Sequence, residues 1–398
     1  MTGNRTRFMV VSAVVTIGLT AASWLAAQSR GEKPQPDSLY KYLSVFTEVL
    51  GLVRQAYVKD TDVTQLMAGA YEGAADSLGP FTVYVPAEQV ADYRRLREHP
   101  APDTGLLVLR EHGWIYVVGV APGSPADKAG FERGDLVSKI DGQPTRELQV
   151  WQIEQVFASH RGTTVPVSIV RQGDGKQLQL AVEADATLAV ASTTRVREIP
   201  VLRIARFTKS TTGAVEAELQ KLASAKVDKL AIDLRGVAGG DPQLSYQVAD
   251  LLVSGEMGTL KARDEVRQRF VADGEPVWKG RIVVLTDRGT LGAAEVLARV
   301  LDEAAGATLV GEATFGHAGH QGQVELASGA LVELTDAFYT GPKGEPVAES
   351  IEPDQEVDER SRTLREKDLS LDELILQRGV GTLEKPAAEQ APAAAKAA

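Results

Sequence analysis

The 398-residue sequence contains no cysteine, which excludes disulfide bonds, thiolate metal sites, cysteine nucleophiles and a lipid-bearing amino-terminal cysteine. It is also poor in basic relative to acidic residues, with 43 Lys and Arg against 54 Asp and Glu. The net charge of −11, with no dense Lys/Arg cluster to offset it, argues against nucleic acid as a partner.

The remaining composition is that of an ordinary soluble protein. Hydrophobic residues make up 43% of the chain and charged residues 24%, which is enough apolar side chain to build packed cores without disulfides. Because a single core rarely grows beyond about 250–300 residues, the length predicts two or three domains.

The amino terminus has the pattern of an export signal. Arg5 and Arg7 precede an uncharged run from Phe8 to Ala27, and the small residues at its end offer a cleavage site. We therefore predict that the chain is exported, with residues 1–28 as a signal peptide or a membrane anchor. The run of about 20 residues is just long enough to span a bilayer. The sequence leaves cleavage and retention as open alternatives.

Residues 29–100 are predicted to form a linker followed by helices. The linker, 29–38, is polar and contains two prolines. A helix over 39–57 is predicted because its apolar residues alternate at spacings of three and four. These residues are Leu39, Leu43, Phe46, Leu50, Val53 and Tyr57. A second helix is predicted over 63–76, before the Gly79-Pro80 break.

Residues 104–183 change to strand patterns, with turns at Gly123–Ala126 and Gly130–Asp135 and a helix over 148–159. In this order they resemble a PDZ domain, which we place at 101–186. The resemblance implies that an extended peptide adds to a sheet edge while a glycine-bearing loop binds its terminal carboxylate. The loop and strand that would do so are Thr104, Gly105, Leu106, Leu107 and Val108. A PDZ fold retained only for packing is the alternative.

From residue 199 onward, predicted strands and helices alternate, as in 229–234 (strand), 244–254 (helix), 281–286 (strand) and 292–305 (helix). Alternation of this kind predicts a layered α/β domain with a largely parallel sheet. After Gly379 the composition of Ala, Pro, Glu and Lys predicts a disordered tail at 379–398.

Four segments of this α/β region carry a family resemblance: Ile232–Gly240, Val310–Gly316, Tyr339–Gly344 and Ile351–Asp354. Together with the upstream PDZ pattern, they resemble the carboxy-terminal processing (tail-specific) peptidases, the S41 serine proteases. The resemblance implies a multidomain α/β protein with a helical amino-terminal segment, a β-sandwich or barrel-like PDZ domain and a ClpP/crotonase-like core at 187–378. It also implies a periplasmic location and no cofactor.

The family uses a serine nucleophile, a lysine base and a glutamine that orients the lysine. At the corresponding positions this sequence has Gly292, His317 and Gln321. By resemblance, the backbone N–H groups of Gly239, Gly240 and Ala293 would form the oxyanion hole. Two of the three catalytic side chains are therefore substituted, and we predict an inactive site.

Two alternative interpretations would give the site a catalytic function. Thr290, two residues before the nucleophile position, could pair with His317, or it could cap a helix. His317 and His320, with Glu295 or Glu312 nearby, could bind zinc, or the histidines could be hydrogen-bonded in a relic pocket. We favour the structural interpretation in both cases and predict no metal.

Three hypotheses for function remain. The favoured one is an exported, non-catalytic relative of the processing peptidases that binds protein carboxy termini as an adaptor, chaperone-like sensor or regulator of an active relative. The second is a serine-type endopeptidase with a non-standard nucleophile. The third is a structural homodimer formed through helix 39–57 with its cleft unused.

Overall fold

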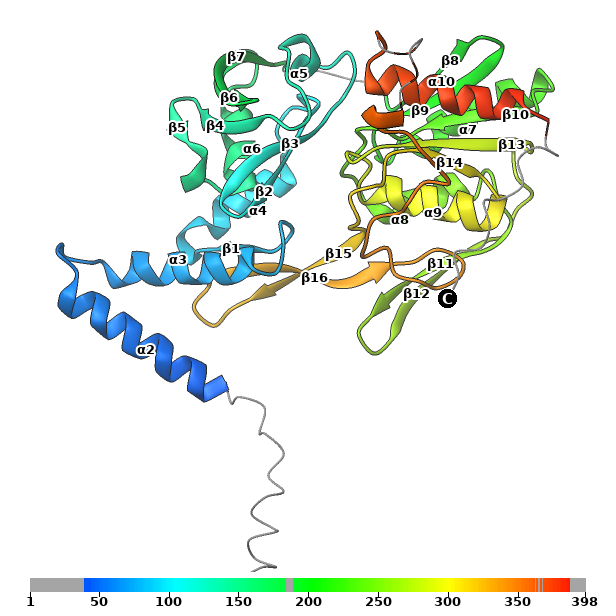
Figure 1. Cartoon of the computed structure of the whole chain (residues 1–398). Coiled ribbons are helices and arrows are strands. Elements are labelled where there is room, and N and C mark those ends of the chain that lie inside the picture. The colour runs from blue at the N-terminus through cyan, green and yellow to red at the C-terminus, as the bar shows by residue number, and fades with distance from the viewer. Residues whose placement is uncertain (1–38, 184–188, 362, 364–365, 367, 387–398) are drawn as a thin grey trace, which may run out of the picture. The chain divides into compact units, whose positions relative to one another are not determined.

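The computed structural model describes residues 39–183, 189–361, 363, 366 and 368–386 (Figure 1). The chain divides into two compact units, 1–69 and 70–398. The predicted export segment at 1–28 lies outside the described residues. Among the residues that are described, no helix is long and apolar enough to cross a membrane.

The described part of the first unit consists of helices. Helix α2 (Leu39–Ala56) and helix α3 (Val63–Asp76), which continues into the second unit, confirm the two predicted amphipathic helices. None of the residues of α2 is buried, and large apolar side chains such as Tyr40 and Leu52 are 82% and 57% exposed. The periodicity that predicts α2 therefore marks an apolar face that nothing in the described chain covers.

The predicted PDZ domain is an antiparallel sheet with two helices. The sheet has the order β2-β3-β4-β6-β7, with β5 on β4. Its strands are β2 (Leu106–Glu111), β3 (Trp114–Val120), β4 (Leu136–Ile140), β5 (Gln143–Pro144), β6 (Thr163–Arg171) and β7 (Asp174–Val182). Helices α5 (Pro125–Lys128) and α6 (Val150–Ser159) and the 3₁₀ turn η3 (Thr145–Glu147) complete it. Alternate residues of the strands, including Ile115, Val137 and Ile169, face a common core.

The α/β domain is built on a six-stranded sheet in the order β17-β14-β13-β10-β9-β8. Its strands are β8 (Ala191–Val196), β9 (Ile199–Ile204), β10 (Lys229–Asp233), β13 (Arg281–Thr286), β14 (Thr308–Gly311) and β17 (Gln355–Glu356). All neighbours pair in parallel except the edge strand β8, which confirms the largely parallel sheet.

Helices cover both faces of this sheet (Figure 1). The helices α7 (Thr211–Ser224), α8 (Pro242–Ala249) and α9 (Ala293–Ala305) pack on one face, and α10 (Leu371–Glu384) packs on the other. The buried strands read as continuous apolar runs because both of their faces are covered.

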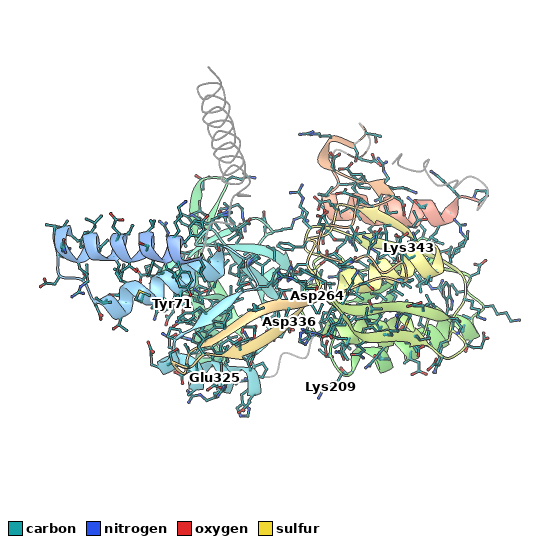
Figure 2. The ribbon with its side chains drawn as sticks, turned by 90° about the horizontal axis from the view of Figure 1, so that it is seen from below. Tyr71, Lys209, Asp264, Glu325, Asp336 and Lys343 are labelled. Atoms are coloured by element: carbon teal, nitrogen blue, oxygen red, sulfur yellow. The ribbon has the colours of Figure 1, made fainter. Side chains whose placement is uncertain are left out.

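A second sheet in the same unit has the order β1-β16-β11-β12, with β15 paired to β16. Its strands are β1 (Val83–Val85), β11 (Gly255–Ala262), β12 (Val266–Ala272), β15 (Gly319–Glu325) and β16 (Leu331–Tyr339). Figure 2 labels Asp336 and Glu325, which lie at opposite ends of the β15–β16 ribbon. Helix α4 (Val90–Glu98) and the 3₁₀ turns η2 (Ala87–Gln89) and η4 (Glu359–Ser361) are the remaining elements.

One predicted boundary is wrong. The sequence predicts a disordered tail from residue 379, but α10 continues to Glu384, and Val380 and Leu383 within it are buried. These side chains lie at helical spacing and pack against the sheet, so they extend the core. A Cβ atom at Gly379 would overlap Leu285 of β13, which shows how closely the helix approaches the strand. The rest of that tail, from residue 387, lies outside the described residues.

Candidate functional site

The predicted catalytic positions come together at one cavity of about 580 Å³. Gly292, His317, Gln321, Gly239 and Gly240 all line it, although they come from segments more than 80 residues apart at the extremes. The other lining residues are Phe81, Arg97, Asp241, Pro242, Gln243, Leu291, Gly319, His320, Glu333 and Tyr339.

Gly292 occupies a sharp turn between strand β13 and helix α9. Its backbone has φ 64° and ψ −113°, a positive-φ conformation that side-chain-bearing residues rarely adopt. A Cβ atom built on it would find only the carbonyl oxygen of His317, 3.9 Å away, within 4 Å. A strained strand-to-helix turn that points into a cavity is the arrangement on which hydrolases carry a nucleophile. Here the turn is present and the hydroxyl is not.

Glu295 connects the turn at Gly292 to the loop that carries His317. Its carboxylate is fully buried and accepts hydrogen bonds from the N–H groups of Gly292 (2.9 Å), Gly316 (2.6 Å) and His317 (2.9 Å) and from the hydroxyl of Thr314. Burial raises the pKa of Glu295, and the hydrogen bonds act in the opposite direction. The motifs of the sequence do not predict this role; the available signal is an acidic residue at the third position of a helix.

His317 is held by aromatic stacking. Its ring lies 3.9 Å from that of Phe81 at an interplanar angle of 11°, and the ring of Phe338 meets it edge-on at 5.4 Å. Its Nε2 is 3.1 Å from the hydroxyl of Thr335. Burial lowers the pKa of His317 to about 4, so the imidazole is neutral at pH 7. The position predicted to hold the base therefore carries an uncharged ring.

Gln321, the retained member of the set, contacts the same threonine. Its Nε2 donates to the hydroxyl of Thr335 at 3.1 Å, so Gln321 and His317 share one partner. Thr335 lies on β16, outside every motif of the sequence, and nothing in the sequence indicated its role.

Thr290 and Ala293 are not among the residues that line the cavity. The Thr290 hydroxyl is fully buried, donates to the carbonyl of Leu234 at 3.0 Å and accepts from the N–H of Asp287 at 3.0 Å. This geometry does not assemble the Thr290–His317 pair. Ala293 is buried at the first position of α9.

The residues considered for metal binding have separate partners. His320 Nδ1 lies 2.7 Å from Asp336 Oδ1, and Glu312 pairs with Arg133 at 2.6 Å. Across the described ranges, no group of three or more His, Asp or Glu side chains is arranged to hold a metal ion.

Among the residues that the structure describes, none of those lining the cavity is a serine, threonine, cysteine or lysine. Its single hydroxyl belongs to Tyr339, whose pKa is raised by burial, so this phenol is not an activated nucleophile.

A second hollow of about 430 Å³ lies between strand β2 and helix α6. Of the five residues predicted to bind peptide, Thr104, Leu106, Leu107 and Val108 line it. Gly105 does not; it makes the turn with φ 70°, and a Cβ atom there would overlap Ser124. Helix α6 contributes Val150, Ile153 and Phe157, which make the opposite wall apolar.

The two hollows adjoin. Arg97 and Gly240 line both of them. Nearby, Arg133 from the PDZ-like domain pairs with Glu312 and lies 3.5 Å from Asp287 of the α/β domain. Asp287 in turn accepts the N–H groups of Gly236 and Gly289, so this contact reaches the loops beside the cavity.

Comparison with known families confirms both parts of the resemblance, the S41 peptidase and the PDZ domain. Residues 198–357 match peptidase family S41, and residues 116–171 match the PDZ domain. The chain is 29% identical over 343 residues to a carboxy-terminal-processing protease of Bartonella bacilliformis, with 84% of this chain and 79% of that one covered. It is 26% identical over 341 residues to the processing protease CtpA of Bacillus subtilis, with 84% and 72% covered.

A solved structure has the same fold. The photosystem II D1 C-terminal processing protease matches with a TM-score of 0.65 and 25% identity, covering 86% of this chain and 92% of that one. The predicted fold class, with a PDZ domain and an S41-type α/β core, is therefore confirmed.

Proposed function

We propose that this chain, which carries an S41 peptidase domain and a PDZ domain and is related to the carboxy-terminal processing proteases, binds polypeptide carboxy termini without cleaving them. One observation carries the proposal: the cavity that holds the positions assigned to catalysis by resemblance is lined by Gly292 and His317, and by no serine, threonine, cysteine or lysine among the described residues.

The loss of cleavage follows from how the missing groups act. A serine and its base work as a unit, and removing such a unit typically lowers the rate by about 10⁴ to 10⁶. His317 could serve as a base only weakly, because burial lowers its pKa to about 4 and leaves it a poor proton acceptor. The backbone donors at Gly239 and Gly240 remain, and they stabilise a transition state only when a nucleophile has attacked.

Binding is supported by the hollow between β2 and α6. Its walls at Leu106, Val108, Ile153 and Phe157 suit an apolar final side chain. The adjoining turn at Gly105 is the position at which PDZ domains present backbone N–H groups to a terminal carboxylate. The ligand class we propose is therefore a protein or peptide with a free, apolar carboxy terminus.

The setting of this activity is part of the same proposal. We infer export to the periplasm, with association to the inner membrane if residues 1–28 are retained. The exposed apolar face of α2 supports homodimer formation through that helix. An adaptor, a sensor of unfolded termini or a regulator of an active relative would each use these properties.

The direct test incubates the purified chain from residue 29 onward with an unstructured protein that ends in apolar residues, and follows it by mass spectrometry. We expect the substrate to remain intact while a fluorescent peptide with the same free carboxy terminus binds, and the amidated peptide to bind at least tenfold more weakly. Cleavage that persists in a chromatographically pure sample would favour an active endopeptidase with an unrecognised nucleophile. Equal affinity for the free and amidated peptides would contradict carboxylate recognition.

A further inference from the structure

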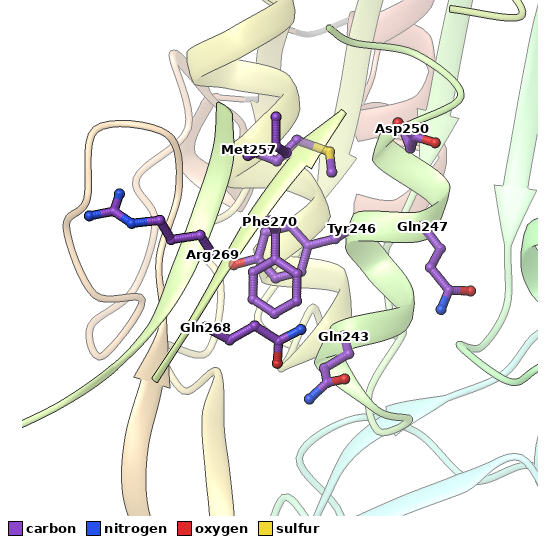
Figure 3. Close-up of a pocket in the computed structure, with 9 residues that line it drawn as sticks. Gln243, Tyr246, Gln247, Asp250, Met257, Gln268, Arg269 and Phe270 are labelled. Atoms are coloured by element: carbon purple, nitrogen blue, oxygen red, sulfur yellow. The ribbon is translucent and has the colours of Figure 1, made fainter. Parts of the chain in front are cut away.

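A third hollow, of about 290 Å³, lies between helix α8 and the β11–β12 pair (Figure 3). It is separate from the PDZ groove, and it shares with the catalytic-position cavity only Gln243, in the first turn of α8. Its lining residues are Gln243, Tyr246, Gln247, Asp250, Met257, Gln268, Arg269, Phe270 and Val271.

The apolar part of this hollow is an aromatic stack. The rings of Tyr246 and Phe270 lie 3.9 Å apart with an interplanar angle of 7°, and Figure 3 shows them one over the other. The Tyr246 hydroxyl donates to the carbonyl of Thr340 at 2.7 Å, which fixes the orientation of the ring. Stacked aromatic faces attract alkyl chains and cations alike.

The polar part of the hollow includes an acceptor that has no donor. Asp250 Oδ1 is buried, and no described residue donates a hydrogen bond to it. Asp250 is the C-cap of α8, where the helix carbonyls already make the environment negative. A buried carboxylate oxygen at this end of a helix is unfavourable unless a cationic donor reaches it.

The neighbouring arginine, Arg269, does not donate to Asp250 Oδ1. Arg269 lies 3.2 Å from Glu256, and its guanidinium points away from Asp250 in Figure 3. Within the described part of the chain, the residues that line the hollow include no lysine and no arginine besides Arg269. The described residues therefore supply no donor to Asp250 Oδ1.

Strand β12 supplies a place for that molecule to bind. In the described sheet β12 pairs only with β11 and forms the outer edge, so backbone donors and acceptors along its other side face no strand. Its apolar residues Val266 and Val271 are 45% and 51% exposed. An exposed strand edge of this length is the template onto which an extended polypeptide adds.

We propose that an extended polypeptide segment pairs with the edge of β12 and places one lysine or arginine side chain in the hollow. The methylene groups would lie against the stack of Tyr246 and Phe270, and the cationic group would donate to Asp250. This site would recognise a basic residue within a polypeptide segment and would not require a free carboxy terminus. It is therefore independent of the PDZ groove and of any chemistry at Gly292.

The test uses a fluorescent nine-residue peptide of alternating Thr and Val with a central Lys, acetylated and amidated so that neither terminus is free. A matched peptide carries norleucine at the centre, which keeps the methylene groups and removes the charge. We expect the lysine peptide to bind the full-length protein at least tenfold more tightly by fluorescence polarisation, because only its ammonium group can donate a charge-assisted hydrogen bond to Asp250.

Two variants assign the site. Asp250→Asn should abolish the preference for lysine over norleucine, while Asp264→Asn, which removes an exposed carboxylate in the β11–β12 turn labelled in Figure 2, should preserve it. Backbone pairing is tested with two peptides, each N-methylated at one of the two alternating sets of positions. The peptide whose methyl groups replace the N–H groups that face β12 should lose binding, and the other should keep it. Equal affinity of wild type for the lysine and norleucine peptides, or an unchanged preference in Asp250→Asn, would overturn the proposal.

Discussion

The state of His317 makes a quantitative prediction about how stability depends on pH. Folding lowers the pKa of this imidazole from 6.5 to about 4 because the ring is buried against Phe81 and Phe338. The unfolded chain therefore binds a proton at His317 between these two values and the folded chain does not. By linkage, His317 costs no stability above pH 6.5, and stability is lost as pH falls toward 4.

The size of the effect follows from the shift. Each unit of pKa difference is worth about 1.4 kcal/mol, so His317 should remove about 2 kcal/mol of unfolding free energy between about pH 7.5 and pH 5, and about 3 kcal/mol by pH 4. The matched variant is His317→Phe, which preserves an aromatic ring against Phe81 and cannot titrate. Because Glu295 accepts from the backbone N–H of residue 317, this change leaves that hydrogen bond in place.

Urea unfolding of both proteins across this pH range gives the answer as a difference. We expect the wild type to lose about 2 kcal/mol more than His317→Phe between pH 7.5 and pH 5. Removal of the exposed His112 by His112→Gln controls for the loss of a histidine as such. Parallel pH profiles for wild type and His317→Phe would show that the ring is not buried in its neutral form, and the description of this side chain would be wrong.

Further predictions test the other features of the chain. Gly292→Ser should lower the free energy of unfolding by about 1–3 kcal/mol, because the new side chain must adopt φ 64°, and urea melts that match wild type would contradict the strained turn. Glu295→Gln should lower the free energy of unfolding by about 2–3 kcal/mol, because an amide nitrogen would face the backbone N–H groups that now donate to the carboxylate. The controls are Glu345→Gln and Glu349→Gln, which change exposed carboxylates. A smaller loss for Glu295→Gln than for these controls would refute the role of Glu295. Phe46→Glu should shift the mass of a dimer to that of a monomer in light scattering, and an unchanged mass would exclude α2 as the interface.

Much of the fold could be predicted because its segments carry their own periodicity. The helix at 63–76 and the strand at 281–286 match the predicted bounds, since the first has a regular apolar face and the second is a short run that is buried after Arg281. The second sheet, which contains β15 and β16, was not predicted, because its strands lack such periodicity. Strand β15, with the sequence GHQGQVE, is mostly exposed or half-buried and has no apolar alternation. Its place is set by pairing with β16, which the sequence of β15 alone does not encode.

The candidate site shows the same division. The order of the motifs was enough to predict that Gly292, His317 and Gln321 lie together, because the family resemblance assigns each of them a position in the fold. All three line one cavity. The supporting residues were not predicted, since Thr335 and Phe81 reach His317 only through tertiary packing. Glu295 lay within a quoted motif, but its four hydrogen bonds depend on where the loop at 314–317 returns.

The central claim is that the chain retains the framework of a peptidase site and lacks its nucleophile and base. The most direct measurement compares wild type with the double variant Gly292→Ser, His317→Lys in cleavage of an unstructured protein that ends in apolar residues. The double variant has a hydroxyl on the strand-to-helix turn, an amine beside Gln321, and the backbone donors of Gly239 and Gly240. We expect wild type to leave the substrate intact, Gly292→Ser alone to gain little, and the double variant to cleave and to react with a serine-directed fluorophosphonate. Cleavage by wild type as fast as by the double variant, with the same pH profile, would mean that Gly292 and His317 are not the catalytic positions.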